Sequence, residues 1–349
     1  MVGFADKILR KANGTFKKPA KKVDNPIRWG IIGLGYMAEC FGSAIDGNPN
    51  GVVAAVGSRR MDKAIGFAKK HYGCKAFGSY EELMQDDSLD VIYIATPTKH
   101  HYENIKDCLK YGRNVLCEKP ITSDAEQLEE LILLAKKRGC FLMEGMWMKC
   151  LPSYQKAKQW IADGMIGTVD LIKCDFNKRE IIDTSKAVFD MEQDGGVLRD
   201  YGVYAVAFPT GFAKGMPKVN GAARLSDFEI DSDWHIHMDY GRIQAFISIS
   251  SDYQSLSKAA IMGGQGTIEW ESQFNRTNKI TLYDAYGRKL DEFTANYEYE
   301  GFEYEVEEVQ RALKAGWKES IAVPLESSLI TQKIITALLR EAYVKHNVL

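Results

Sequence analysis

Short apolar runs alternate with helical patterns through the first part of the chain. The runs are rich in valine, isoleucine, leucine and methionine, and they cover residues 27–33, 52–58, 91–97, 114–120 and 140–147. Near-continuous runs of this kind, separated by helical segments, are typical of parallel strands buried on both faces. The pattern therefore predicts an α/β domain with a doubly wound parallel sheet of the Rossmann type over residues 27–148.

The connection after residue 122 carries clear helix signals. Ser123 and Glu126 match a capping box, and apolar residues follow at helical spacing at positions 128, 131, 132 and 135. Gly139 stands where such a helix would stop. We therefore expect a helix that begins after Ser123 and ends before Gly139.

The pattern changes after residue 148. Strand-like stretches cover 168–176, 234–240, 243–250, 267–270 and 279–283, and helical patterns follow at 302–313 and 327–339. Gly241 lies between two of the strands, as in a hairpin turn. We expect an α+β substrate and oligomerisation domain at 149–325, with a large, open-faced, mostly antiparallel sheet. Residues 326–349 are expected to form a C-terminal helix that packs back on the Rossmann domain.

An open sheet needs cover on both faces, so a second subunit is expected on the face that the helices leave bare. We therefore predict a homo-oligomer, either a dimer or a dimer of dimers. The formal net charge is only −2, and no apolar run approaches the ~18 residues of a membrane span. Nucleic acid and membrane are therefore not expected as partners.

The seven cysteines are scattered without a paired spacing, which favours reduced thiols and a cytoplasmic location. We expect no metal site, because His235 and His237 alternate with aspartates along one extended strand and lie too far apart to close on zinc. Residues 1–26 form a basic N-terminal extension with seven lysines and arginines against two aspartates. A solvated arm packed on its own or a neighbouring subunit is favoured over a polyanion-binding segment.

A dinucleotide fingerprint follows the first predicted strand. Residues 33–38 read GLGYMA, which fits G-x-G-x-x-A. In this motif Gly33 permits the tight turn, Gly35 lets the pyrophosphate approach the backbone, and Ala38 allows close helix packing. The N–H groups at the start of the helix, around Tyr36 and Met37, favour phosphate binding.

The end of the second predicted strand bears on the choice between NAD and NADP. NAD sites usually carry an acidic residue there, whereas this chain has Ser58, Arg59 and Arg60. Two guanidinium groups suit the 2′-phosphate of NADP. We therefore predict NADP as cofactor. The alternative is that the arginines are solvated and the protein also uses NAD.

The segment Cys117–Pro120 ends the fourth predicted strand, where a ligand crevice is expected. Lys119 could there donate a hydrogen bond to a substrate oxygen, and a surface ion pair is the equal alternative. At this point the chain resembles the glucose-fructose oxidoreductase / inositol dehydrogenase / MocA family. The resemblance rests on segments 33–38, 95–101, 112–120, 144–149, 194–204 and 301–309. It is strongest to the branch of dimeric dihydrodiol dehydrogenases and NADP-linked, xylose-type sugar dehydrogenases.

The resemblance implies roles for individual residues. It implies Lys119 as the catalytic lysine, Tyr204 as the acid and base, and Asp200 as a residue that orients the substrate. Trp147 and Lys173 join Asp200 and Tyr204 in the expected substrate pocket. The expected contacts to the nicotinamide half of the cofactor are Thr96, Pro97, His101, Glu118 and Lys119. Asp194 and the pair Gly145-Met146 depart from the family's usual residues, which concerns the pocket's shape.

These residues suit hydride chemistry on a hydroxyl group. A nearby lysine and an oxidised nicotinamide would lower the pKa of Tyr204 from about 10 towards neutrality. We predict an NADP(H)-dependent dehydrogenase that acts on a CH–OH carbon of a sugar or cyclic diol. Two alternatives remain: a non-catalytic, NADP-sensing regulator on the same fold, and an NAD-linked dehydrogenase of the inositol type. Structural roles are also open: Tyr204 or Trp147 as ordinary core, and Asp200 as a helix cap.

Overall fold

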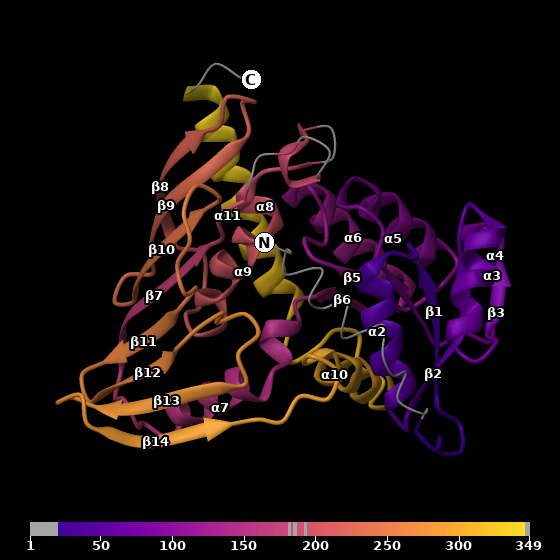
Figure 1. Ribbon diagram of the computed structural model, residues 1–349, viewed down its shortest axis with the longest axis horizontal. Coiled ribbons are helices and arrows are strands. Elements are labelled where there is room, and N and C mark those ends of the chain that lie inside the picture. Colours follow the sequence, from indigo (N-terminus) through magenta and orange to yellow (C-terminus); the bar gives the residue numbers. More distant parts are fainter. Residues whose placement is uncertain (1–19, 181–182, 184–186, 192–193, 346–349) are drawn as a thin grey trace.

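Two sheets, with helices between them, make up the molecule. The computed structural model describes residues 20–180, 183, 187–191 and 194–345. Figure 1 shows a six-stranded sheet on the right and an eight-stranded sheet on the left. Helices α8 (Val197–Asp200), α9 (Gly202–Ala207) and α11 (Leu325–Lys345) lie between the two sheets.

The six-stranded sheet is parallel throughout and has the order β3-β2-β1-β4-β5-β6. Its strands are β1 (Ile27–Ile32), β2 (Gly51–Gly57), β3 (Lys75–Phe77), β4 (Val91–Ile94), β5 (Val115–Glu118) and β6 (Leu142–Gly145). The predicted doubly wound Rossmann sheet is therefore confirmed. Only β3 was not predicted, because its three residues, one exposed and two half-buried, carry too little apolar pattern.

The helices of this domain cover both faces of the sheet. They are α2 (Tyr36–Gly47), α3 (Met61–Lys70), α4 (Tyr80–Met84), α5 (His101–Lys110) and α6 (Ala125–Arg138). The predicted capping box of α6 is wrong, because the carboxylate of Asp124 caps the helix by accepting the N–H of Glu126. Ser123 instead donates to Asp194 Oδ2 (2.5 Å). Gly139 ends the helix in the left-handed conformation, as predicted.

The eight-stranded sheet has the order β14-β13-β12-β11-β7-β10-β9-β8. Its strands are β7 (Val169–Asn177), β8 (Lys218–Leu225), β9 (Asp231–Asp239), β10 (Gln244–Ser250), β11 (Ala259–Gly263), β12 (Gly266–Trp270), β13 (Lys279–Asp284) and β14 (Lys289–Thr294). All pairs are antiparallel except β7 with β10. The hairpin between β9 and β10 turns at Gly241, at φ +84°, as predicted.

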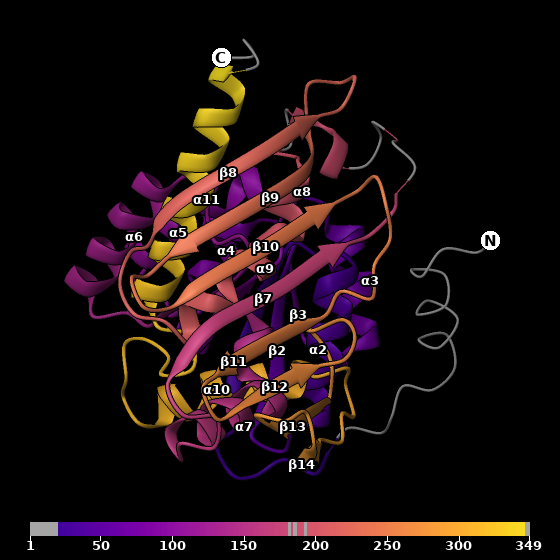
Figure 2. The same cartoon turned by 90° about the vertical axis from the view of Figure 1, so that its left-hand side faces the viewer.

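One face of this sheet carries helices and the other carries none of the described chain. Figure 2 looks onto the bare face, with the strands in front and the helices behind. Helix α7 (Pro152–Ala162) packs near β13 and β14, while α8, α9 and α11 lie on the inner face. The expected open-faced sheet is confirmed.

The last two helices return to the Rossmann domain. Helix α10 (Phe302–Lys314) packs on α2, and α11 packs on α6 and α9. Lys333 and Glu129 form an ion pair (2.6 Å) between α11 and α6. The boundaries at residues 148 and 325 stay predictions.

The start of the described chain also packs on the Rossmann domain. Lys22 Nζ donates to the backbone oxygens of Asp46 (2.7 Å) and Asn48 (2.9 Å) at the end of α2. These carbonyls have no partner inside the helix, so a lysine ammonium is well placed there. The other part of the predicted basic extension, residues 1–19, lies outside the described residues.

Candidate active site

The glycine turn between β1 and α2 has the geometry of a dinucleotide site. Gly33 adopts φ +81°, and a Cβ there would lie 2.4 Å from backbone atoms of Ala95 and Thr96. A Cβ on Gly35 would meet nothing closer than 4.0 Å. Gly35 is the residue before α2, and the first N–H groups of a helix lack intrahelical acceptors, so those of α2 are available to a phosphate. The turn therefore fits a cofactor diphosphate, and Ala38 is fully buried behind it.

The two arginines after β2 differ in their partners. Arg60 forms a bidentate pair with Asp62, with Nη2 2.5 Å from Oδ2, and its backbone N–H donates to Ser58 Oγ. Arg59 is exposed, and its positive charge favours the ionised form of Tyr80 and the neutral form of His100. Arg59 therefore has its guanidinium freer for a 2′-phosphate than Arg60.

The loop after β4 is tied to the loop after β5 by His101. This side chain is 1% exposed, and its ring nitrogens lie 2.6 Å from Thr96 O and 2.9 Å from Pro120 O. Thr96 Oγ1 in turn accepts a hydrogen bond from Asn104 (2.9 Å). His101 therefore holds two strand ends together, and Pro97 is exposed beside them.

Lys119, Asp200 and Tyr204 come together across the two domains. Lys119 Nζ donates to Asp200 O at 2.5 Å and lies 3.3 Å from Asp200 Oδ1. The same Nζ lies 5.2 Å from the centroid of the Tyr204 ring, over its face. The strand end of the Rossmann sheet and the helix α9 thus meet at one point.

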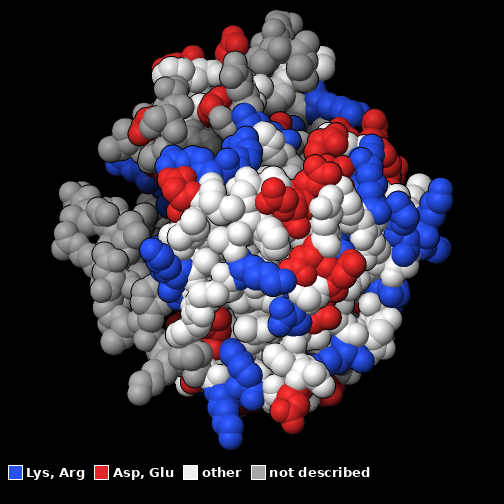
Figure 3. All heavy atoms as spheres, turned by 90° about the vertical axis from the view of Figure 1, so that its right-hand side faces the viewer, with Lys and Arg blue, Asp and Glu red and all other residues white. Residues whose placement is uncertain are grey.

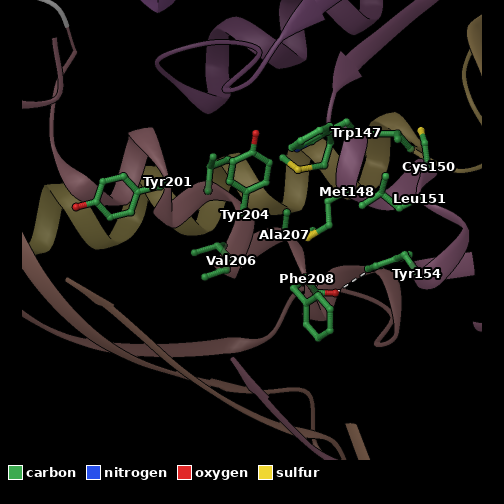
Figure 4. Packing of buried hydrophobic residues seen from close by; sticks show 14 of the residues in the cluster. Trp147, Met148, Cys150, Leu151, Tyr154, Tyr201, Tyr204, Val206, Ala207 and Phe208 are labelled. Carbon is green, nitrogen blue, oxygen red and sulfur yellow. Dashed lines mark hydrogen bonds between the residues drawn. The ribbon is translucent and has the colours of Figure 1, made fainter. Parts of the chain in front are cut away.

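The hydroxyl of Tyr204 points towards the Rossmann domain. Figure 4 shows it directed away from the eight-stranded sheet, with Trp147 beside it. Trp147 stacks on Phe302 of α10, with centroids 4.5 Å apart. The indole N–H lies close enough to the phenol to favour its ionised form, although no well-formed hydrogen bond to a described residue is made. Trp147 therefore forms one wall beside the phenol.

Burial raises the pKa of Tyr204 well above its ordinary range. The carboxyl groups of Glu118, Glu305 and Asp200 raise the pKa further. With the protein's own groups alone the pKa of Tyr204 therefore shifts upwards, opposite to the direction predicted for Lys119 together with an oxidised nicotinamide, because burial is the largest cause. At neutral pH the phenol is protonated.

Lys173 is not part of this site, and its assignment to the substrate pocket is wrong. Successive side chains of a strand point to opposite faces. Cys174 points inwards, where its thiol contacts Ala205 O (3.4 Å). Lys173 therefore faces the bare side, where it lines a hollow with His235 and His237.

Four buried polar residues around the site escaped the sequence analysis. Tyr93 donates to Glu118 Oε1 (2.5 Å), and Glu144 accepts the N–H of Ile121 (3.2 Å). Glu305 is fully buried, and neither of its oxygens has a hydrogen-bond partner among the described residues. Burial raises the pKa of Glu118, Glu144 and Glu305. The sequence could have indicated Tyr93 and Glu144, because each is a polar residue within an apolar run that was predicted to be a buried strand.

Lys149 is the fourth of these residues. It is 2% exposed and donates to Thr210 Oγ1 (2.9 Å) and to Ser327 of α11. Burial lowers its pKa to about 8. Lys149 therefore joins the Rossmann side of the site to the last helix.

The two departures from the family pattern are accommodated locally. Asp194 adopts φ +59°, a conformation that glycine adopts more easily, and its carboxylate accepts the Ser123 hydroxyl. A Cβ on Gly145 would lie 3.1 Å from Cys117 O, so the position has room only for a small residue.

The surface shows mixed charge. Figure 3 shows basic and acidic side chains interspersed over the outer face of the Rossmann domain. Among the described residues, no helix combines the length and apolar character of a membrane span, and no three His, Cys, Asp or Glu side chains gather as metal ligands.

Comparison with known proteins connects both domains to one family. Residues 27–146 match the model of an oxidoreductase family with an NAD-binding Rossmann fold, and residues 154–269 match the GFO/IDH/MocA C-terminal domain. The chain is 32% identical over 329 residues to trans-1,2-dihydrobenzene-1,2-diol dehydrogenase of Xenopus tropicalis, covering 91% of this chain and 99% of the relative. It is 29% identical over 318 residues to the enzyme of the same name from Homo sapiens, covering 88% and 95%.

Solved structures support the fold. A 3-ketoreductase from Actinomadura kijaniata, in complex with TDP-benzene and NADP, superposes with a TM-score of 0.74 at 22% identity, covering 90% of this chain and 96% of that one. Aldose-aldose oxidoreductase from Caulobacter crescentus gives 0.81 at 20% identity, covering 92% and 98%. The chain belongs to the glucose-fructose oxidoreductase / inositol dehydrogenase / MocA family and is an NAD(P)-dependent oxidoreductase.

Proposed function

We propose that this protein is an NADP(H)-dependent oxidoreductase that interconverts a hydroxyl and a carbonyl group on a cyclic diol or a sugar. The observation that carries the proposal is the meeting of Lys119, Asp200 and Tyr204 at the strand ends that follow a dinucleotide-binding turn. The relatives that span most of the chain are named for a cyclic diol, which supports that substrate class.

The substrate oxygen would lie between Tyr204 and Lys119. The bound cofactor supplies or accepts the hydride. Lys119 has three N–H groups, and Asp200 supplies the two acceptors that the described residues present, so one N–H can reach the substrate oxygen. Asp200 holds the ammonium so that this N–H is directed at the substrate oxygen, and Trp147 covers one side of the substrate space.

The raised pKa of Tyr204 sets the proton chemistry. In the direction of reduction, the protonated phenol gives its proton to the oxygen as the carbonyl becomes an alkoxide. In the direction of oxidation, the phenolate must take the hydroxyl proton. Since the folded protein favours the phenol, the rate of oxidation should increase as pH rises and more phenolate forms.

Substitution of Tyr204 by phenylalanine tests the proposal, with a matched control. Tyr201 lies on the same segment, stacks on the same Phe176 ring, and points its hydroxyl away from Tyr204 (Figure 4). Loss of a positioned acid costs about 10²–10⁴ in rate. We expect Tyr204→Phe to lose this much kcat while still binding NADPH, and Tyr201→Phe to keep most of it.

The assay follows NADPH absorbance with a trans vicinal cyclohexanediol, pentoses and hexoses, and with the corresponding ketones. Turnover that survives Tyr204→Phe unchanged would refute the assigned chemistry. A protein that binds NADPH but converts none of these compounds would instead favour the regulator.

We also propose that a second copy of the chain covers the bare face of the eight-stranded sheet. That face has a hollow of about 710 Å³ and a 48% exposed Phe246 stacked on His237. Exposed aromatic side chains on an uncovered sheet favour association. Light scattering should give the mass of a dimer or a dimer of dimers, and Phe246→Glu should shift it to a monomer. A monomeric wild type would contradict this proposal.

The seven cysteines are unpaired thiols, and five of them are buried. This arrangement suits a reducing compartment, so a cytoplasmic location is part of the proposal.

A further inference from the structure

A fully buried carboxylate lies at the start of β9, directly behind α8. Asp231 is 0% exposed. Its Oδ2 accepts the backbone N–H of Leu198 at 2.9 Å and the indole N–H of Trp234 at 2.8 Å. Its Oδ1 accepts the hydroxyl of Tyr343, in α11, at 3.0 Å. Both oxygens are therefore engaged, by donors from three different elements.

The carboxylate of Asp231 also lies where the Cβ of any other residue at position 196 would be. Gly196, just before α8, adopts φ +110°, and a Cβ there would lie 2.0 Å from Asp231 Oδ1. The carboxylate thus packs directly on the backbone of the segment that leads into α8. This contact gives a physical reason for glycine at position 196 in the motif that ends at Tyr204.

The segment that Asp231 holds carries the active-site groups. Leu198 is two residues before Asp200, whose backbone oxygen accepts Lys119 Nζ. Tyr204 follows in α9, one helical turn further on. A shift of α8 would therefore move both the acceptor of Lys119 and the phenol that lies beneath the ammonium.

The same carboxylate connects this segment to the Rossmann domain by a second route. Tyr343 lies on α11, and Arg340 of that helix pairs with Asp124 (3.2 Å) at the start of α6. The contacts close a loop: from Lys119 to α8, through Asp231 to α11, and back to the domain that carries Lys119. This second route joins α8 to the last helix, so we expect it to contribute mainly to the stability of the packing between the two domains.

Packing alone does not account for a carboxylate here. Burial disfavours the charged form of Asp231, whereas Arg199 and the three hydrogen-bond donors favour it. An apolar side chain would fill the space without that cost. A carboxylate adds two directional acceptors, which define where the N–H of Leu198 and the hydroxyl of Tyr343 must lie.

We propose that Asp231 is a positioning residue that fixes α8 and α9 so that Asp200 and Tyr204 meet Lys119. It touches neither substrate nor cofactor and acts through the backbone of residues 196–200. The inference rests on the proposed function, because it concerns the geometry of that site.

Three variants of the full-length protein separate positioning from simple stability. Asp231→Asn keeps an acceptor for Leu198 and Trp234, so we expect kcat near the wild-type value. Asp231→Ala removes this acceptor. A misplacement of catalytic groups by about 1 Å can cost about 100-fold in rate, so we expect kcat to fall roughly 10- to 100-fold. Tyr343→Phe removes only the donor from α11, so we expect a lower Tm with kcat changed by less than about threefold. If the alanine variant does not fold, Asp231→Ser replaces it, with an intermediate kcat expected.

The readouts are kcat per NADPH-binding site, the Kd for NADPH from its fluorescence, and Tm. The substrate is whichever cyclohexanediol, sugar or ketone the wild type converts. Loss of kcat at an unchanged Kd supports positioning, because the glycine turn lies on the other domain. Equal kcat per site in all folded variants overturns the inference, as does a loss in Tyr343→Phe as large as in Asp231→Ala. Failure of the proposed function is recognised separately, by full activity of Tyr204→Phe.

Discussion

Replacement by alanine should impair different properties at the two glycines of the turn, Gly33 and Gly35. An added methyl at Gly33 would lie 2.4 Å from backbone atoms of Ala95 and Thr96, and the φ of +81° is unfavourable for alanine. An added methyl at Gly35 has no neighbour within 4.0 Å other than the Gly33 oxygen at that limit, and φ there is −103°. Gly33→Ala should therefore damage the protein itself, whereas Gly35→Ala should damage only cofactor binding.

The magnitudes follow from these contacts. Positive φ costs alanine about 1–2 kcal/mol, and overpacking against backbone costs about 1–3 kcal/mol, so Gly33→Ala should lose about 2–5 kcal/mol of stability. At Gly35 the methyl projects where the diphosphate would approach, and one overpacked methyl costs about 1–3 kcal/mol of binding. The Kd for NADPH should rise about 5- to 150-fold. The stability of Gly35→Ala without cofactor should stay within about 1 kcal/mol of wild type.

The two variants are compared by thermal unfolding without cofactor and by NADPH fluorescence titration. Gly33→Ala should lower Tm by roughly 3–8 °C. Gly35→Ala should leave Tm nearly unchanged and lose most of the increase in Tm that NADPH gives the wild type. Wild-type affinity in a well-folded Gly35→Ala would refute the placement of the diphosphate at this turn.

Three further predictions concern charged side chains. Arg60 is already paired with Asp62, so Arg59→Ala should reduce the preference for NADPH over NADH about 10-fold or more, while Arg60→Ala should change this preference little. Steady-state kinetics with both cofactors measure the preference. Equal effects of the two substitutions would contradict the prediction. Glu305 has a raised pKa in the folded protein, so its protonated form stabilises the fold and that stabilisation is lost as pH rises above about 4.5. The difference in Tm between Glu305→Gln and wild type should therefore grow as pH rises above about 4.5. Parallel curves of Tm against pH would show that the carboxyl is not desolvated. Lys149 has a pKa lowered from 10.5 to about 8, so wild type should gain roughly 3 kcal/mol over Lys149→Met as pH rises through that window; urea unfolding measures it, and an equal gain in Lys149→Met would refute it.

The sequence by itself determined the Rossmann half and its cofactor turn. Local patterns suffice there, because buried parallel strands are apolar along their whole length and the glycine turn is contiguous in sequence. The bare sheet of the second half was likewise predicted, although β8, β11 and β14 were missed. The side chains of β8 and β14 are half exposed or exposed, and β11 is only five residues long. The capping residue of α6 was misassigned by one position, since both Ser123 and Asp124 can cap a helix.

Only the tertiary structure decided the electrostatics of the site. The pKa of Tyr204 rises first because the phenol is buried, and further because Glu118, Glu305 and Asp200 reach it from three separate elements, which no spacing in the sequence reveals. The outward direction of Lys173 depends on the register of β7 in the sheet. Asp231 meets Tyr343 across 112 positions of sequence. Local periodicity specifies which residues form a strand or a helix, whereas burial and charge depend on what the folded chain brings alongside.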